Sequence, residues 1–73
     1  MERAVLQQLL LEAESLLYRG ECTIAEQREL IGTLERRGGD ATIAKLSLRR
    51  LETKQARHIA DRNRLFKQLT DCS

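Results

Sequence analysis

The chain contains no proline and no tryptophan, and among its 73 residues it has one phenylalanine, one tyrosine and one methionine. The scarcity of aromatic residues argues against a surface that stacks on nucleic-acid bases. β-Branched residues are scattered and never alternate with polar ones, so no strand is predicted. Leucine, glutamate, arginine, alanine and glutamine dominate, and these are strong helix formers. The composition therefore favours an all-α fold.

Long apolar runs are also missing. The triplet Leu9-Leu10-Leu11 is typical of the longest, far below the ~20 residues that a membrane span requires. Acidic residues appear early, at Glu12 and Glu14, so no secretory signal is predicted. We expect a cytoplasmic protein with no membrane partner.

Seam residues recur in alternating steps of four and three, which is the 3.5-residue period of a coiled coil. The first series occupies positions 6, 10, 13, 17, 20, 24, 27, 31 and 34, and the second occupies positions 44, 48, 51, 55, 58, 62, 65 and 69. We therefore predict one domain, residues 1–73, with a helix at about 3–37, a turn at 38–40 and a helix at about 41–69. Because so short a loop makes the helices antiparallel neighbours, the predicted fold class is an all-α, coiled-coil-like two-helix hairpin.

The glycines explain where the first helix ends. Gly38 follows two arginines, and a glycine there adopts the left-handed conformation that stops a helix. Asp40 is well placed to cap the second helix, with Thr42 as a competing cap. Gly20, by contrast, lies at a seam position with the period unbroken on both sides, so we expect the first helix to continue through it.

Polar residues gather in the middle of the predicted seam. Centring the turn near Gly39 places Gly20 opposite His58, so we predict that the glycine makes room for the imidazole. Polar seam residues cost stability unless they are paired, but they set register and oligomeric state. We favour that role here, and a polar patch that binds a partner is the alternative. The residues concerned are Gln27, Gln55, His58 and Arg62.

A second apolar stripe flanks each seam, so the predicted apolar face is wider than that of a simple coiled coil. A chain of 73 residues is marginal without a partner, and we expect the hairpin to form a homodimer, a four-helix bundle. The flanking stripe consists of Leu9, Leu16, Thr23, Leu30, Ile59 and Phe66. The full packing and oligomer set comprises Leu9, Leu16, Gly20, Ile24, Gln27, Ile31, Leu51, Gln55, His58, Ile59, Arg62, Leu65 and Phe66.

Charge is unevenly placed along the chain. Residues 1–40 carry five arginines and eight acids, a net charge of −3, whereas residues 41–73 carry eight basic residues and three acids, a net charge of +5. A basic second helix is consistent with an anionic partner such as nucleic acid, but an acidic helix packed on a basic one explains the same pattern. The candidate anion-binding surface comprises Arg49, Arg50, Lys54, Arg57, Arg64 and Lys67.

Residues for catalysis or metal binding are scarce. His58 is the single histidine, and a general base would need an orienting carboxylate, such as Asp61 or Glu21, together with a pocket that two helices do not form. Cys22 and Cys72 are expected about 24 Å apart along the hairpin, too far for an intramolecular disulfide, although a bridge between two chains stays open. One histidine and two distant cysteines make no credible zinc site. We predict that the protein is not an enzyme and that it binds neither a metal nor another cofactor.

Several motifs carry a family resemblance. The chain contains Gly20-Glu21, Ile24-Ala25, Gln27-Arg28, Leu34-Glu35-Arg36, Gly38, Asp40 and His58-Ile59-Ala60-Asp61-Arg62. In this order the motifs resemble a group of short, functionally uncharacterised proteobacterial proteins. The resemblance covers about residues 16–69 and implies a helical hairpin, with no activity to carry over.

The predicted function is a homo-oligomeric protein-interaction or structural module. A protein partner other than a second copy fits the same surface. The alternative is a small dimeric RNA- or DNA-binding regulator that uses the basic second helix.

Overall fold

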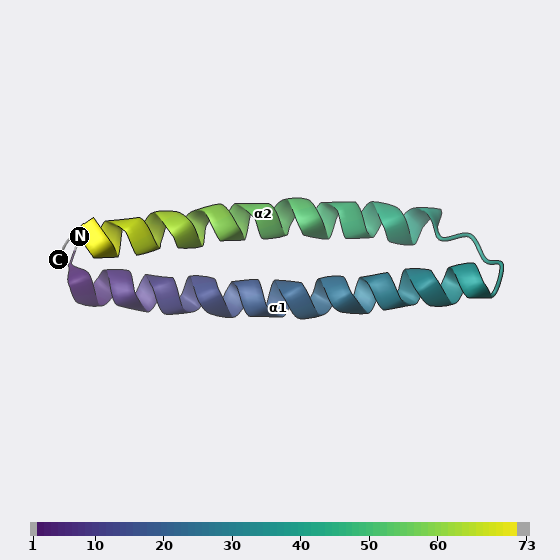
Figure 1. Cartoon of the computed structure of the whole chain (residues 1–73), viewed down its shortest axis with the longest axis horizontal. Coiled ribbons are helices and arrows are strands. Elements are labelled where there is room, and N and C mark those ends of the chain that lie inside the picture. The colour runs from purple at the N-terminus through teal and green to yellow at the C-terminus, as the bar shows by residue number, and fades with distance from the viewer. Residues whose placement is uncertain (1, 72–73) are drawn as a thin grey trace.

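Two long helices lie side by side and antiparallel, with both ends of the chain at the same end of the molecule (Figure 1). The computed structural model describes residues 2–71. Helix α1 spans Arg3–Arg36, helix α2 spans Thr42–Asp71, and residues 37–41 connect them. The hairpin measures 55 × 14 × 12 Å. The predicted all-α hairpin is confirmed, and the helix ends differ from the expected positions by no more than two residues.

The core is a single line of side chains along the contact between the helices. Helix α1 supplies most of it, and α1 continues unbroken through Gly20. The buried residues are Leu6, Ala13, Leu17, Ile24, Ile31, Ala41 and Gln55. All except Ala41 lie at seam positions of the heptad pattern. Each helix therefore buries one narrow stripe and leaves the rest of its surface to solvent.

Helix α1 ends in a Schellman motif built on Gly38, whose φ is 72°. The Gly39 N–H donates to the Leu34 carbonyl over 2.8 Å, and the Gly38 N–H donates to the Glu35 carbonyl over 3.1 Å. These two bonds satisfy carbonyls that the helix end would leave without partners. The left-handed conformation at position 38 costs a residue with a Cβ about 1–2 kcal/mol, which is why glycine stands there.

Two glycines test this account of the turn in opposite directions. Gly38→Ala is expected to destabilise the hairpin by about 1 kcal/mol, because its backbone is left-handed while nothing obstructs its methyl group. Gly32→Ala is expected to stabilise it by about 1 kcal/mol, because Gly32 is inside α1 and only the flexible end of Arg36 lies near. Thermal or urea unfolding of both variants measures the difference. Equal effects of the two replacements would contradict the assigned turn.

Asp40 organises the start of α2. Its Oδ1 atom accepts from the Thr42 N–H over 2.9 Å and from the Thr42 hydroxyl over 2.6 Å. Both hydrogen bonds stabilise the carboxylate, and together with nearby Lys45 they lower the pKa of Asp40 from its ordinary value of 3.8. Asp40 thus caps the helix, and Thr42, the competing cap in the sequence, is its partner.

The lowered pKa of Asp40 predicts how the cap depends on pH. A carboxyl group with a lower pKa in the folded chain stabilises the fold above its unfolded pKa, and this contribution disappears as the pH falls through the folded value. Asp40→Ala should therefore unfold at a lower temperature than the wild type at pH 6, and the two midpoints should converge as the pH falls below 3.8. Circular dichroism melts across this range measure the gap. A gap that stays constant down to pH 2 would contradict the cap.

Candidate interaction surfaces

Two glutamines in the middle of the seam bind the backbone of the opposite helix. The Gln55 Nε2 atom donates to the Leu17 carbonyl over 2.9 Å, and the Gln27 Nε2 atom donates to the Ala44 carbonyl over 3.0 Å. Gln55 is buried and Gln27 is half-buried, so their amides lose hydrogen bonds to water when the helices pack. The two backbone carbonyls replace those bonds. The bonds join α1 and α2 at two heights and so define how far one helix is shifted along the other.

Gly20 lies against Gln55, not against His58. A Cβ atom built at position 20 would overlap the Gln55 side-chain oxygen, and all three of its nearest heavy atoms belong to that amide. The predicted pairing of Gly20 with the His58 imidazole is therefore wrong. The glycine does admit a bulky polar seam residue, but that residue lies three positions earlier along α2.

The contact between Gly20 and Gln55 predicts that the effect of Gly20→Ala on stability depends on the residue at position 55. In the wild-type chain the new methyl group should displace the Gln55 amide from the Leu17 carbonyl, and this loss of about 1 kcal/mol offsets the helix-propensity gain. In a Gln55→Ala background the same replacement should stabilise the hairpin by about 1 kcal/mol. Urea unfolding of the two single variants and the double variant completes the cycle. Equal effects of Gly20→Ala in both backgrounds would disprove the contact.

One side of the seam carries an apolar and basic groove, which we name the Leu16 face. Its groove is lined from α1 by Leu16, Arg19, Gly20 and Thr23, and from α2 by Leu51, Lys54, Gln55 and His58. Toward the chain ends it continues between Leu9, Glu12 and Leu16 of α1 and His58, Asp61 and Arg64 of α2. Leu16 remains 43% exposed. Leu30, two heptads further along α1, extends this face toward the turn.

The opposite side of the seam, which we name the Tyr18 face, combines apolar and acidic residues. Glu14, Tyr18 and Glu21 of α1 line a groove there with Ile59 and Arg62 of α2. Heptad spacing adds Leu11, seven residues before Tyr18, and Phe66, seven residues after Ile59. Their exposed fractions are large, at 69% for Tyr18, 58% for Phe66 and 42% for Ile59.

The flanking residues therefore do not form one wide face. Leu16 and Ile59 lie on opposite sides of the hairpin, because Leu16 precedes a seam residue and Ile59 follows one. In antiparallel helices, residues that precede the seam positions meet on one side and residues that follow them meet on the other. The flanking stripes of the two helices thus lie on different sides, and the molecule has two different faces.

Ion pairs occupy the part of the Tyr18 face nearest the turn. Arg28 Nη2 lies 3.2 Å from Glu52 Oε2, and Lys45 Nζ lies 3.0 Å from Glu35 Oε2. All four side chains are about half exposed, so each pair contributes ~0–1 kcal/mol. Ion pairing between the helices thus explains part of the opposite net charge of α1 and α2. Most cations of α2 take no part in these ion pairs.

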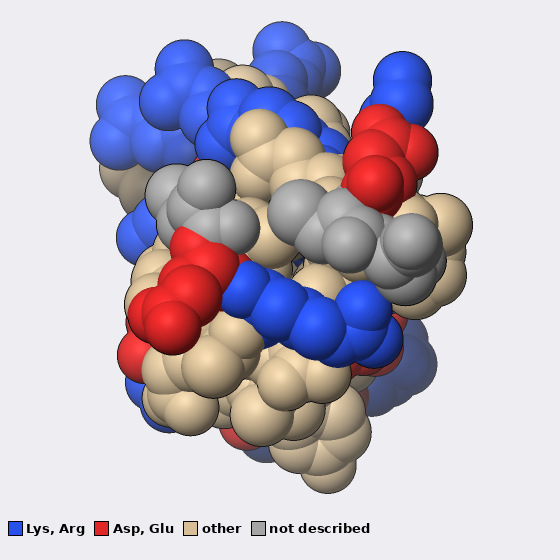
Figure 2. All heavy atoms as spheres, turned by 90° about the vertical axis from the view of Figure 1, so that its left-hand side faces the viewer, with Lys and Arg blue, Asp and Glu red and all other residues tan. Residues whose placement is uncertain are grey.

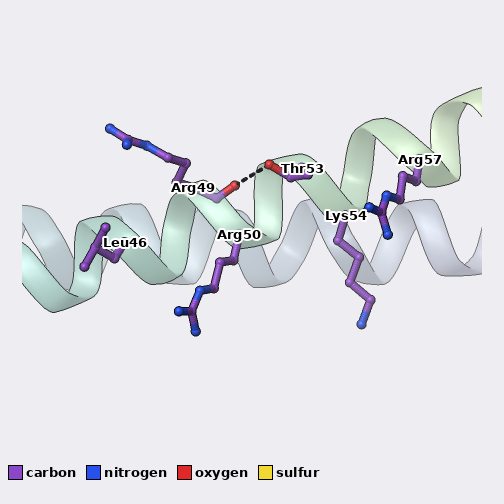
Figure 3. Close-up of a pocket in the computed structure, with 6 residues that line it drawn as sticks. All are labelled: Leu46, Arg49, Arg50, Thr53, Lys54 and Arg57. Atoms are coloured by element: carbon purple, nitrogen blue, oxygen red, sulfur yellow. Dashed lines mark hydrogen bonds between the residues drawn. The ribbon is translucent and has the colours of Figure 1, made fainter.

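A row of cations projects from α2 beside the Leu16 face. Arg50 and Lys54 extend to the same side of the helix and Arg57 turns its head group toward them, whereas Arg49 extends the other way (Figure 3). We name Arg50, Lys54 and Arg57 the basic row. They line a shallow groove with Leu46, Arg49 and Thr53, and Lys54 also lines the groove of the Leu16 face. Viewed from the chain ends, Lys and Arg gather over the upper half of the molecule, where α2 lies (Figure 2).

The structure distributes the sequence-predicted residues over three environments. Within the packing set, Ile24, Ile31 and Gln55 are buried; Leu9, Gly20, Gln27, Leu51, His58, Arg62 and Leu65 are half-buried; and Leu16, Ile59 and Phe66 are exposed. Within the anion-binding set, Arg49, Arg50, Lys54 and Arg57 line one groove, Arg64 pairs with Asp61 over 3.1 Å, and Lys67 is exposed.

Sequence reasoning missed Leu11 and Tyr18. Both are exposed on α1 and lie seven residues apart, next to Glu14 and Glu21. That spacing was the available signal, but it is hard to notice because neither residue adjoins the seam in the way that Leu16 does. Arg19 was missed as well. It lies on the acidic helix α1 and adds a positive charge to the groove of the Leu16 face.

His58 is the one histidine of the chain. It is half-buried at the edge of the Leu16 face, where Lys54 and Asp61 line the same grooves. Over residues 2–71, no group of three or more His, Cys, Asp or Glu could hold a metal ion. Cys22 is an exposed free thiol, and the expectation about Cys72 lies outside the described residues. Neither helix has, within that range, a stretch long and apolar enough to cross a bilayer.

Comparison with family models, curated proteins and solved structures found no match to the chain. The resemblance to short proteobacterial hairpin proteins therefore stays a prediction. What the chain's own geometry defines is a two-helix hairpin with two chemically different faces, and any functional conclusion depends on those faces.

Proposed function

We propose that the protein is an interaction module that functions as a homodimer, with the Tyr18 faces of two hairpins packed into a four-helix bundle. The observation that carries the proposal is the set of large apolar side chains exposed beside a thin core. Tyr18, Ile59 and Phe66 are each at least 42% exposed, and aromatic residues are enriched at protein–protein interfaces.

The size of the exposed surface supports a partner. The chain exposes 5741 Å², whereas a compact folded monomer of 8.4 kDa exposes about 4,600 Å². The excess of about 1,100 Å² exceeds the ~800 Å² that each partner buries in a standard interface. The radius of gyration of 16.6 Å, against about 11 Å for a globular chain of this length, gives the same indication. Packing two rods side by side would bury part of the excess surface and bring the assembly closer to globular proportions.

Charge on the Tyr18 face favours a second copy as the occupant. In a two-fold interface the same patch meets itself, so it must be complementary to itself. The groove of this face carries acidic Glu14 and Glu21 from α1 and basic Arg62 from α2. A two-fold copy brings the acidic side of one patch to the basic side of the other, around an apolar centre of Tyr18 and Ile59.

The Leu16 face fits a two-fold copy less well. Arg19 and Lys54 line its central groove, and Arg50 and Arg57 lie beside it on α2, whereas its acidic residues, Glu12 and Asp61, lie further toward the chain ends. Two such faces packed together around this central groove would oppose like charges, which costs several kcal/mol where water is excluded. The large apolar side chains that it exposes, Leu16 and Leu30, also include no aromatic residue.

A matched pair of substitutions tests the proposal. Ile59→Glu and Leu16→Glu replace residues with almost the same exposure, 42% and 43%, on opposite faces. Sedimentation equilibrium of the wild-type chain should give twice the 8.4 kDa chain mass. Ile59→Glu should weaken the dimer by at least about tenfold, because it buries a charge in an apolar contact, while Leu16→Glu should leave the dimer intact.

Circular dichroism provides the control for folding. Both variants should keep the helical spectrum, since both side chains lie outside the core of the single hairpin. A wild-type chain that stays monomeric at millimolar concentration would overturn the proposal. If Leu16→Glu dissociated the dimer and Ile59→Glu had no effect, the interface would lie on the Leu16 face, and the proposal would be wrong.

A further inference from the structure

We infer that the basic row, Arg50, Lys54 and Arg57, binds the phosphate backbone of a nucleic-acid duplex. The three cations lie within two turns of one helix, and their spacing of four and three residues keeps them on one side. At 1.5 Å per residue the row is about 10 Å long. It is straight, exposed and continuous with the Leu16 face through Lys54.

The charges of the row are not neutralised within the hairpin. The ion pairs of the described residues join Arg28 to Glu52, Lys45 to Glu35 and Arg64 to Asp61, and none includes a member of the row. The groove lined by the row contains no acidic residue. Cations that remain unpaired at this spacing repel one another, so a polyanion that brings several phosphates together relieves the repulsion.

The chemistry of the row favours a duplex over a single strand. Binding to single strands uses aromatic side chains on which bases stack. The two aromatic residues of this chain, Tyr18 and Phe66, belong to the opposite face. A guanidinium group binds phosphate oxygens in a bidentate manner, and this is what Arg50 and Arg57 offer.

The row also lacks the groups that distinguish one base sequence from another. Besides its cations, its groove contains Leu46 and Thr53, and the Thr53 hydroxyl donates to the Arg49 carbonyl of the same helix over 3.0 Å. No asparagine or glutamine of the groove is available to pair with a base edge. Contacts confined to phosphates give affinity without sequence preference.

This inference does not depend on the proposed homodimer. The row adjoins the Leu16 face, so packing of two Tyr18 faces leaves it open, and a monomer presents it equally well. Failure of nucleic-acid binding would leave the sedimentation result unchanged, and a monomeric chain would leave the binding result unchanged.

Fluorescence anisotropy of the full chain with labelled 20-base-pair DNA and RNA duplexes tests the inference. Three phosphate contacts predict a slope of about −2.7 for log affinity against log salt, a loss of about 40-fold between 50 and 200 mM salt. Arg50→Gln and Arg57→Gln should each weaken binding and each lower the slope by about one. Two duplexes of different sequence should bind equally.

Lys67→Gln is the matched control, since it removes one positive charge from an exposed residue of the same helix outside the groove of the row. It should leave the slope within the error of the wild type. Equal losses of affinity for Lys67→Gln and Arg57→Gln would show that binding depends only on net charge and would overturn the assigned row. Tighter binding to the single strand than to the duplex, binding only to anionic phosphatidylserine vesicles, or no binding at 50 mM salt would also overturn it.

Discussion

The arrangement of the hairpin depends on two amide side chains that cross from one helix to the backbone of the other. Apolar seam residues bring α1 and α2 together, but a line of small and branched side chains tolerates shifts along the helix axis. The bonds from Gln55 to the Leu17 carbonyl and from Gln27 to the Ala44 carbonyl favour one shift, because both amides would lose these partners at any other. The missing side chain at Gly20 leaves the space that the Gln55 amide occupies.

Register then determines what the two faces contain. With the helices held at this shift, Tyr18 lies near Ile59 on one side, and Leu16 lies near His58 and Lys54 on the other. One side is suited to self-association by its apolar residues and mixed charge. The other concentrates cations that no carboxylate of the described chain neutralises. A structural and a binding role can therefore coexist on a chain of 73 residues without competing for the same surface.

Much of the fold follows from the sequence by simple rules. The 3.5-residue period predicts both helices, and Gly38 with Asp40 predicts the turn, since a left-handed residue and a capping carboxylate are local requirements. The pairing of Gly20 was predicted wrongly because register is not local. It depends on how five connecting residues turn the chain and on where long glutamine side chains reach, and neither is encoded in the spacing of seam residues.

The two faces were within reach of sequence reasoning, which grouped Leu16 and Ile59 in one packing set without asking on which side each lies. Leu16 and Ile59 both flank the seam, and only their order relative to it shows that they lie on opposite sides of an antiparallel pair. The basic row is a similar case: the sequence named six candidate cations around α2, and side-chain direction selects three of them. Direction follows from the angle of each residue around the helix, so the heptad position separates Arg49 from Arg57.

The central claim is the register set by Gln55, and a nuclear Overhauser spectrum of the full chain tests it most directly. The account predicts contacts between the Gln55 side-chain amide protons and the α protons of Gly20 that are stronger than any between Gly20 and the His58 ring. Contacts from the His58 ring to Gly20, without any from Gln55, would show a different register and contradict the account.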